Sequence, residues 1–294
     1  MPSGGYIGFD RVPSASEAKG RWELEDVYTS RRSNTFPRIA PVVEYVIVAG
    51  GGGAGNGIDG SNAGGGGGAG GYRSSVVGEL SGGGASAEAT ITATYGTSYT
   101  VTVGAGGPAQ TSGVSSSALG ITSTGGGRGG TSNTVSALTG GSGGGAGCPN
   151  PNGPYPGAAG TSGQGYSGGS GNTDQVTYRA GGGGGGAGGP GGNAPSPSGG
   201  VGRATLISGT SETFATGGTG TSQDTGATNT GNGGGAGGNT AVTGKPGGSG
   251  IVILKYPVNC GEFSSIDVGL TYTVTRTSTH IIYRFTQGTG TVIF

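Results

Sequence analysis

The sequence is poor in the side chains from which soluble proteins build cores and active sites. Of its 294 residues, 10% are charged and 6% are aromatic, with one histidine and two cysteines. The cysteines, Cys148 and Cys260, lie far apart, which argues against a disulfide framework. The net charge is zero and the basic residues are dispersed, so no nucleic-acid partner is expected. No apolar run approaches the ~20 residues that cross a bilayer, so we expect no membrane insertion.

Glycine is what the sequence has in abundance: 79 residues, of which 71 lie between Ala49 and Gly250. Glycine loses more backbone entropy on folding than other residues and buries no side chain. Such a segment either stays disordered or folds through its bare backbone. Collagen is excluded, because the run Gly181–Gly186 has no three-residue register. A flexible linker is disfavoured, because segments with strand periodicity frame the region.

Alternation of apolar and polar residues predicts strands in segments 42–48, 87–94, 99–103 and 251–254. The four residues 95–98 are predicted to form a hairpin turn between two of these strands. The glycine runs are predicted to form extended threefold helices of the polyproline II type, with a rise of about 3.1 Å per residue. In such helices the backbone N–H and C=O groups bond to neighbouring runs, which satisfies buried backbone. The runs expected to pack together are 64–71, 140–147, 181–192 and 233–238.

The residues also carry a resemblance to a known family. It rests on an ordered series of blocks, namely Val43–Gly53, Gly70–Ser74, Gly96–Gly107 and Gly247–Tyr256. Over about 42–257 the chain resembles the glycine-rich domain of tail-fibre and other virion proteins of bacteriophages, and the leader 5–24 is similar to the start of cyanophage-type structural proteins. This resemblance implies a rigid polyglycine core that presents variable loops to a host receptor.

The sequence favours three regions. Residues 1–41 are rich in charge and contain a short amphipathic helix within 21–32, expected to attach the protein to a particle or to other copies through Trp22, Leu24, Val27 and Tyr28. Residues 42–257 are the glycine-rich domain, and 258–294 are a small β-meander. The expected fold class is mainly β with glycine-rich extended (polyglycine II-like) helices, a short N-terminal α-helix and a small C-terminal β-meander.

Motifs for catalysis are weak. Gly50, Gly52 and Gly55 have the spacing of a dinucleotide fingerprint, but no amphipathic helix follows to hold a pyrophosphate. His280 is the only histidine and lies in a predicted strand, so neither a catalytic triad nor a zinc site can be assembled around it. We therefore expect no enzyme activity, no cofactor and no metal.

The candidate binding residues lie where other residues interrupt the glycine runs. Proline restricts the backbone, and tyrosine offers a large contact area that can stack on a sugar ring. The predicted receptor-binding residues are Pro149, Pro151, Tyr155, Tyr166, Asn172 and Tyr178. The alternative is that these segments are solvated connections whose tyrosines cover the edge of the glycine runs.

The sequence is compatible with three functions. The favoured one is a virion tail-fibre or adhesin component, exposed on the particle and assembled in the host cytoplasm, which binds a host surface glycan or outer-membrane protein. The alternatives are a virion structural protein without a receptor, such as a capsid decoration or tail component, and an ice-binding protein. The expected partners are other virion proteins and further copies of the chain. A homotrimer is expected, which would cover a free edge at Thr291–Phe294.

Overall fold

The computed structural model describes residues 39–57, 63–132, 135–148, 155–172, 180–237 and 243–294. The chain divides into two units, Met1–Ala40 and Pro41–Phe294, and the fold described here is that of the second. Its two 3-10 turns are η1 (Gly82–Gly84) and η2 (Val258–Cys260). Neither turn, nor any other described helix, could cross a membrane. The strands are β1 (Val42–Val48), β2 (Tyr72–Ser74), β3 (Ile91–Thr92), β4 (Ser98–Val103), β5 (Ser116–Ala118), β6 (Ile121–Ser123), β7 (Arg203–Thr205), β8 (Glu212–Phe214), β9 (Ile251–Pro257), β10 (Ser265–Ile266), β11 (Thr271–Arg276) and β12 (His280–Ile293).

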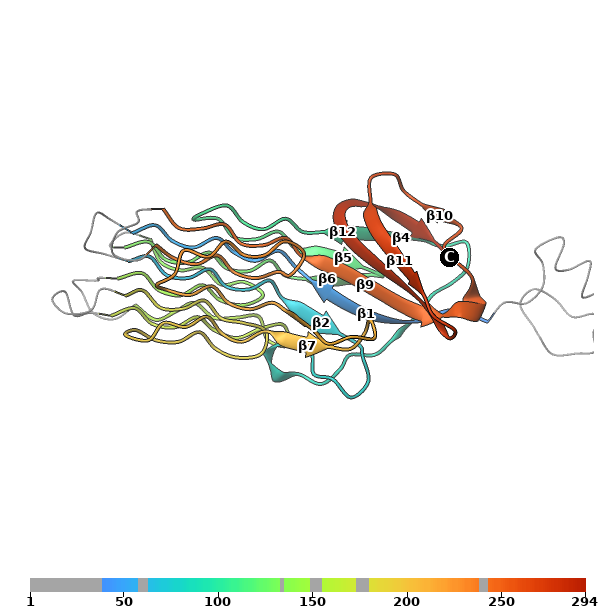
Figure 1. Cartoon of the computed structure of the whole chain (residues 1–294), viewed down its shortest axis with the longest axis horizontal. Helices are drawn as coiled ribbons and strands as arrows, with labels where there is room; N and C mark the ends of the chain where they lie inside the picture. The colour runs from blue at the N-terminus through green and yellow to red at the C-terminus, as the bar shows by residue number, and fades with distance from the viewer. Residues whose placement is uncertain (1–38, 58–62, 133–134, 149–154, 173–179, 238–242) are drawn as a thin grey trace, which may run out of the picture. The chain divides into compact units, whose positions relative to one another are not determined.

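Ten of these strands form one antiparallel sheet in the order β2-β1-β9-β12-β4-β5-β6, with β3 on β1 and with β10 and β11 on β12. The sheet lies at one end of the unit, and the glycine runs extend from it towards the other end (Figure 1). The alternation in β1 places Val43, Tyr45 and Ile47 in one buried cluster and Val46 and Val48 in another. Both faces of this central strand are therefore covered.

The two ends of the strand order, β2 and β6, come close to each other. The N–H of Gly71 donates to the carbonyl of Thr124 at 2.8 Å, and the Ser123 hydroxyl donates to the carbonyl of Gly71 at 2.5 Å. Arg73 bridges the same junction: its Nη1 donates to the carbonyl of Thr122, and its Nε and Nη2 bind Glu88. The sheet therefore nearly closes into a barrel, with few unpaired edge groups along this seam.

Strand β12 joins two parts of the sheet, because its two halves pair with different strands. Its first half, His280–Phe285, pairs with β9, and its second half, Gly288–Ile293, pairs with β4. The strand changes neighbours at Gly288, where φ is +99° and a Cβ would lie 1.9 Å from the carbonyl oxygen of Gly269. Only glycine fits this close approach in the left-handed region.

The interior of the curled sheet is filled by aromatic rings. Phe263 packs on the interior faces of β9 and β12, with its ring centroid 5.6 Å from that of Tyr256, 4.5 Å from that of Tyr283 and 4.6 Å from that of Phe294. Tyr256 packs edge-on against Phe294 at 5.1 Å. Aromatic pairs of this geometry contribute about 0.5–1.5 kcal/mol each beyond the area that they bury. The C-terminal residues thus supply much of the barrel core.

The other face of β1 and β9 is covered by the small hairpin of β7 and β8. Ile207 and Phe214 from this hairpin pack with Tyr72 and with the outer apolar residues of the sheet. Arg284 of β12 forms an ion pair with Glu212 of β8 at 2.5 Å, and this hydrogen bond holds the pKa of the Glu212 carboxyl below its usual value. The hairpin is therefore fixed to the sheet by both apolar and charged contacts.

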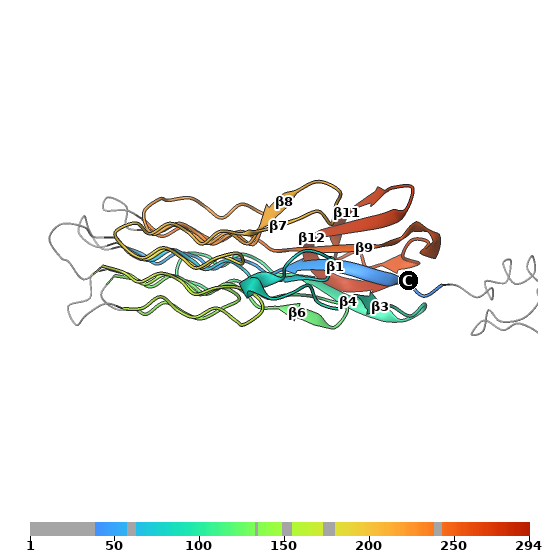
Figure 2. The same ribbon diagram turned by 90° about the horizontal axis from the view of Figure 1, so that it is seen from below.

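The glycine runs bond to one another with a repeat of three residues. Along the run that follows β1, Gly50 and Gly53 donate to one neighbouring run, Gly51 and Ala54 to a second, and Gly52 and Gly55 to a third. The acceptors are the carbonyls of Val114 and Thr111, of Gly248 and Lys245, and of Gly68 and Gly65, respectively. Both views show these runs side by side (Figures 1 and 2). These six backbone donors are therefore satisfied laterally, as buried backbone requires.

The runs lie too close together for side chains. A Cβ on Gly67 would lie 2.0 Å from the carbonyl oxygen of Gly52, and one on Gly52 would lie 2.3 Å from that of Gly127. Carbon and oxygen cannot approach to such distances without moving the backbone. We call this arrangement of laterally bonded runs the glycine stack.

The fold class expected from the sequence is wrong. The described residues of Pro41–Phe294 are mainly β and are organised around one nearly closed antiparallel sheet, with helix confined in this part of the chain to η1 and η2. The glycine runs are extended segments that continue from the strands of this sheet. The α-helix expected within 21–32 lies outside the described residues.

The C-terminal residues are not a separate meander. Strand β12 lies inside the sheet, because its backbone pairs with both β9 and β4 and its alternating apolar side chains join theirs in one buried cluster. The edge expected at Thr291–Phe294 is also wrong, since residues of β12 there pair with β4 on one side and β10 on the other. Similarly, the expected hairpin at 95–98 is a turn whose flanking strands pair elsewhere, β3 with β1 and β4 with β12.

The buried tyrosines predict a loss of stability in alkali. Burial raises the pKa of the Tyr72 hydroxyl to about 12, against an ordinary value near 10. Because the unfolded chain releases this proton first, its stabilisation is full below about pH 10 and is lost by about pH 12, roughly 2 to 3 kcal/mol in all. Urea unfolding between these pH values should show the decline, and Tyr72→Phe should make it shallower. If the free energy of unfolding declined equally in both proteins, ionisation of Tyr72 would not be the cause of the alkaline loss of stability.

Candidate functional site

The glycine runs end together at the side of the stack away from the sheet. Asn56 marks this end: its side-chain Oδ1 accepts from the N–H of Gly244 at 3.0 Å, and its carbonyl accepts from Ser132 at 3.2 Å. The N–H of Cys148 donates to the carbonyl of Ala63 at 2.9 Å. Residues from several distant parts of the sequence therefore meet at one surface, which we call the tip.

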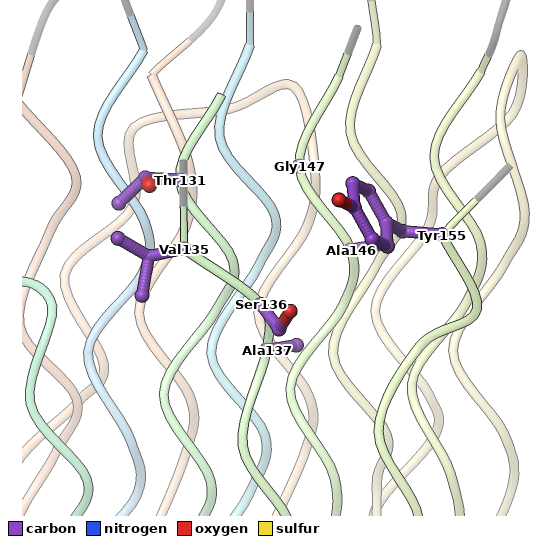
Figure 3. A pocket seen from close by; sticks show the side chains of 7 residues that line it. All are labelled: Thr131, Val135, Ser136, Ala137, Ala146, Gly147 and Tyr155. Carbon is purple, nitrogen blue, oxygen red and sulfur yellow. The ribbon is translucent and has the colours of Figure 1, made fainter. Parts of the chain in front are cut away.

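The tip contains a small hollow beside Tyr155 (Figure 3). The tyrosine ring lies against the run that contains Ala146 and Gly147, and it is 42% exposed. The hollow measures about 20 Å³, which is room for roughly one water molecule. It is lined by Thr131, Val135, Ser136, Ala137, Ala146, Gly147 and Tyr155. A hollow of this size holds part of a ligand, such as one hydroxyl group, while the exposed ring offers a flat face beside it.

The backbone around the hollow is fixed by hydrogen bonds between runs. Thr131 donates to the carbonyl of Val135 at 2.9 Å, and Ala146 donates to the carbonyl of Gly169 at 3.0 Å. Ala146 is 1% exposed. The site is therefore built on backbone that is held from several sides, and no side chain that lines it is charged.

The structure separates the residues that the sequence grouped. Tyr155 lies at the tip, and so does Asn172, whose N–H donates to the carbonyl of Ala180 at 3.2 Å. Tyr166 begins the same run as Asn172 at the end near the sheet, where its N–H donates to the carbonyl of Gly186. The two residues are six positions apart, or roughly 19 Å along an extended run. Tyr166 is therefore not part of the tip surface.

Other predicted site residues lie outside the described residues. These are Pro149, Pro151 and Tyr178 of the binding segments, and Trp22, Leu24, Val27 and Tyr28 of the attachment segment. Conversely, Thr131, Val135 and Ser136 line the hollow but are not among the residues predicted from the sequence. The available signal was the break in glycine at 131–139, which resembles the interruption that contains Tyr155.

His280, the only histidine of the sequence, is not among the residues that line the hollow. His280 lies in β12, and its Nδ1 lies 2.8 Å from the Thr279 hydroxyl. Among the residues that the structure describes, no group of three or more His, Cys, Asp or Glu side chains is placed to hold a metal ion. The side chains that line the hollow at the tip carry the hydroxyls of Thr131 and Ser136 and the aromatic ring of Tyr155.

Together, the sheet and the laterally bonded runs define a class of protein in which a β-barrel-like base carries a glycine stack. The family model described as "glycine-rich domain" matches residues 29–257. The chain belongs to this glycine-rich domain family. No curated protein and no solved structure matches the chain.

Proposed function

We propose that this protein is a structural component of a bacteriophage particle, a tail-fibre or adhesin component whose glycine stack presents binding residues at the tip. The observation that supports it is the convergence of the run ends at the tip, with Tyr155 exposed among them. Loops held by a rigid support commonly bind partners, and tyrosine provides contact area at low entropic cost. The resemblance of the sequence blocks to virion proteins supplies the phage context.

The proposed partners are a host surface glycan or outer-membrane protein at the tip, and other virion proteins at residues 1–41. We propose self-association, with a homotrimer as the expected form, exposure on the virion after assembly in the host cytoplasm, and no enzyme activity. Labelling intact particles with gold-conjugated antibody against residues 39–294 tests the location. Gold at the fibre ends supports the adhesin, whereas gold distributed over the capsid supports a decoration protein and contradicts it.

Replacing Tyr155 with alanine should weaken binding to bacterial surface glycans. The ring is the largest exposed side chain lining the hollow, and loss of a central aromatic contact costs about 2 kcal/mol or more in binding. We therefore expect roughly a thirtyfold weaker apparent affinity on an array of bacterial polysaccharides or on host cells. The measurement uses purified full-length protein.

Tyr272→Ala is the matched control, because Tyr272 of β11 is 40% exposed and lies on the sheet instead of the tip. This variant should bind as the unaltered protein does. If both variants weakened binding equally, the binding would be nonspecific adsorption and would not depend on the tip. A protein that binds no cell or glycan would contradict the adhesin and favour the structural component without a receptor.

A further inference from the structure

A second hollow lies at the junction between the sheet and the glycine stack. It is an open groove of about 400 Å³, within the range of small-molecule sites. Its walls come from four segments distant in the sequence: the end of β4, the turn around residue 229, the residue Ser249 just before β9, and the middle of β12. The polar residues that line it are Thr228, Asn229, Ser249, Thr286 and Gln287. It lies far along the runs from the tip, so it is a different site from the one proposed above.

The groove is held in shape by hydrogen bonds on its own residues. The N–H of Asn229 donates to the Ser249 hydroxyl oxygen at 2.9 Å, and that hydroxyl donates to Asn229 Oδ1 at 3.2 Å. The flanking backbone is fixed by the N–H of Gly250, which donates to the carbonyl of Gly104 at 2.8 Å. The wall is thus preorganised and does not need to form on binding.

Asn229 is held in an uncommon backbone conformation. Its φ is +59°, in the left-handed region that non-glycine residues seldom adopt. The bonds to Ser249 use its N–H and its Oδ1, and they leave the side-chain Nδ2 with two hydrogens to donate. Asparagine adopts this region more readily than most non-glycine residues, and here it lies in the turn around residue 229. Asn229 lines the groove, so this side-chain amide is a donor available to a ligand there.

The lining selects the chemistry of the ligand. No charged side chain lines the groove among the described residues, so an ionic ligand would lose water without gaining a counter-charge. Hydroxyl and amide groups instead offer several donors and acceptors close together. We propose that this groove binds a neutral carbohydrate of roughly one or two rings. The inference does not depend on the proposed function, since it concerns a separate surface.

The test is titration of the full-length protein with neutral sugars, read out by saturation-transfer NMR. The probes are glucose, galactose, N-acetylglucosamine, maltose and lactose, with glucuronic acid as the charged comparison. At least one neutral sugar should bind in the millimolar range or tighter, and glucuronic acid should bind more weakly. Absence of binding by every neutral sugar at millimolar concentration would overturn the proposal.

Two variants test the location. Asn229→Gly removes the amide and keeps a residue that tolerates positive φ, and Gln287→Ala removes an exposed side chain. Each should weaken sugar binding about tenfold, as expected for one lost hydrogen bond of about 1.4 kcal/mol. Gln110→Gly is the matched control, since Gln110 also has a positive φ of 62° but lies outside the groove; it should bind as the unaltered protein does.

The tip and the groove are distinguished by Tyr155→Ala. If sugar binding survives this variant but weakens in Asn229→Gly and Gln287→Ala, the groove is the site. If it is lost in Tyr155→Ala and kept in both groove variants, the sugar binds at the tip and the groove proposal is wrong.

Discussion

Replacing Gly184 with valine is expected to abolish the stable fold. A Cβ at this position would lie 1.9 Å from the carbonyl oxygen of Gly67 and 2.4 Å from its carbonyl carbon. The obstacle is backbone on a neighbouring run, so no change of side-chain rotamer relieves the clash. The N–H of Gly184 also donates to the carbonyl of Gly218 at 2.8 Å, which limits movement of the run. We expect a loss of more than about 4 kcal/mol, comparable with the whole stability of a marginal domain.

Urea unfolding and limited proteolysis measure this effect. Ala159→Val is the control, because Ala159 is exposed on an outer run; its free energy of unfolding should change by no more than about 0.5 kcal/mol. If Gly184→Val unfolded at the same urea concentration as the unaltered protein, the close lateral packing of the runs would be refuted.

A chain that ends at Pro257 is expected not to fold, although it contains all of residues 29–257, which match the family model. Without β12, strand β9 loses its partner His280–Phe285, and β4 loses its partner Gly288–Ile293. The truncation also removes the aromatic rings of Phe263, Tyr283, Phe285 and Phe294 from the barrel interior. Loss of one large buried aromatic side chain costs about 3–5 kcal/mol, so the loss of several exceeds the stability of a typical domain.

The control is a chain that begins at Ile39. The residues that it lacks, 1–38, fall in the other unit, so it should unfold cooperatively like the full chain. The readouts are solubility, near-ultraviolet circular dichroism and the sharpness of thermal unfolding. A soluble protein ending at Pro257 with a sharp transition would show that 258–294 is independent after all.

The sequence was informative where side chains alternate. The strands expected at 42–48, 99–103 and 251–254 correspond to β1, β4 and β9, because a period of two marks a strand directly. The segment 87–94 was overestimated: only Ile91–Thr92 form a strand there. The place of β12 could not be derived, since its partners β4 and β9 are distant in sequence and alternation does not say which strands pair.

The candidate site shows the same limit. Tyr155 lies at the tip, but Tyr166, which the sequence groups with it, lies at the end of its run near the sheet. The position of a residue between the sheet and the tip depends on where each run turns. A run of glycine has no side-chain pattern that would fix its register against a neighbour. Interruptions can therefore be recognised in the sequence, while their positions in space cannot.

The three-residue repeat of the lateral bonds constrains how this protein can change in length. An insertion of three residues returns each N–H to the same neighbour and lengthens a run by about 9 Å. An insertion of one or two residues turns every later donor towards the wrong neighbour, because successive donors such as Gly50, Gly51 and Gly52 address different runs. Homologues whose glycine stacks differ in length should therefore differ by insertions of three residues, present in each of the neighbouring runs. Insertions of other sizes should be confined to the loops between runs, where the backbone does not have to keep the three-residue repeat of lateral hydrogen bonds.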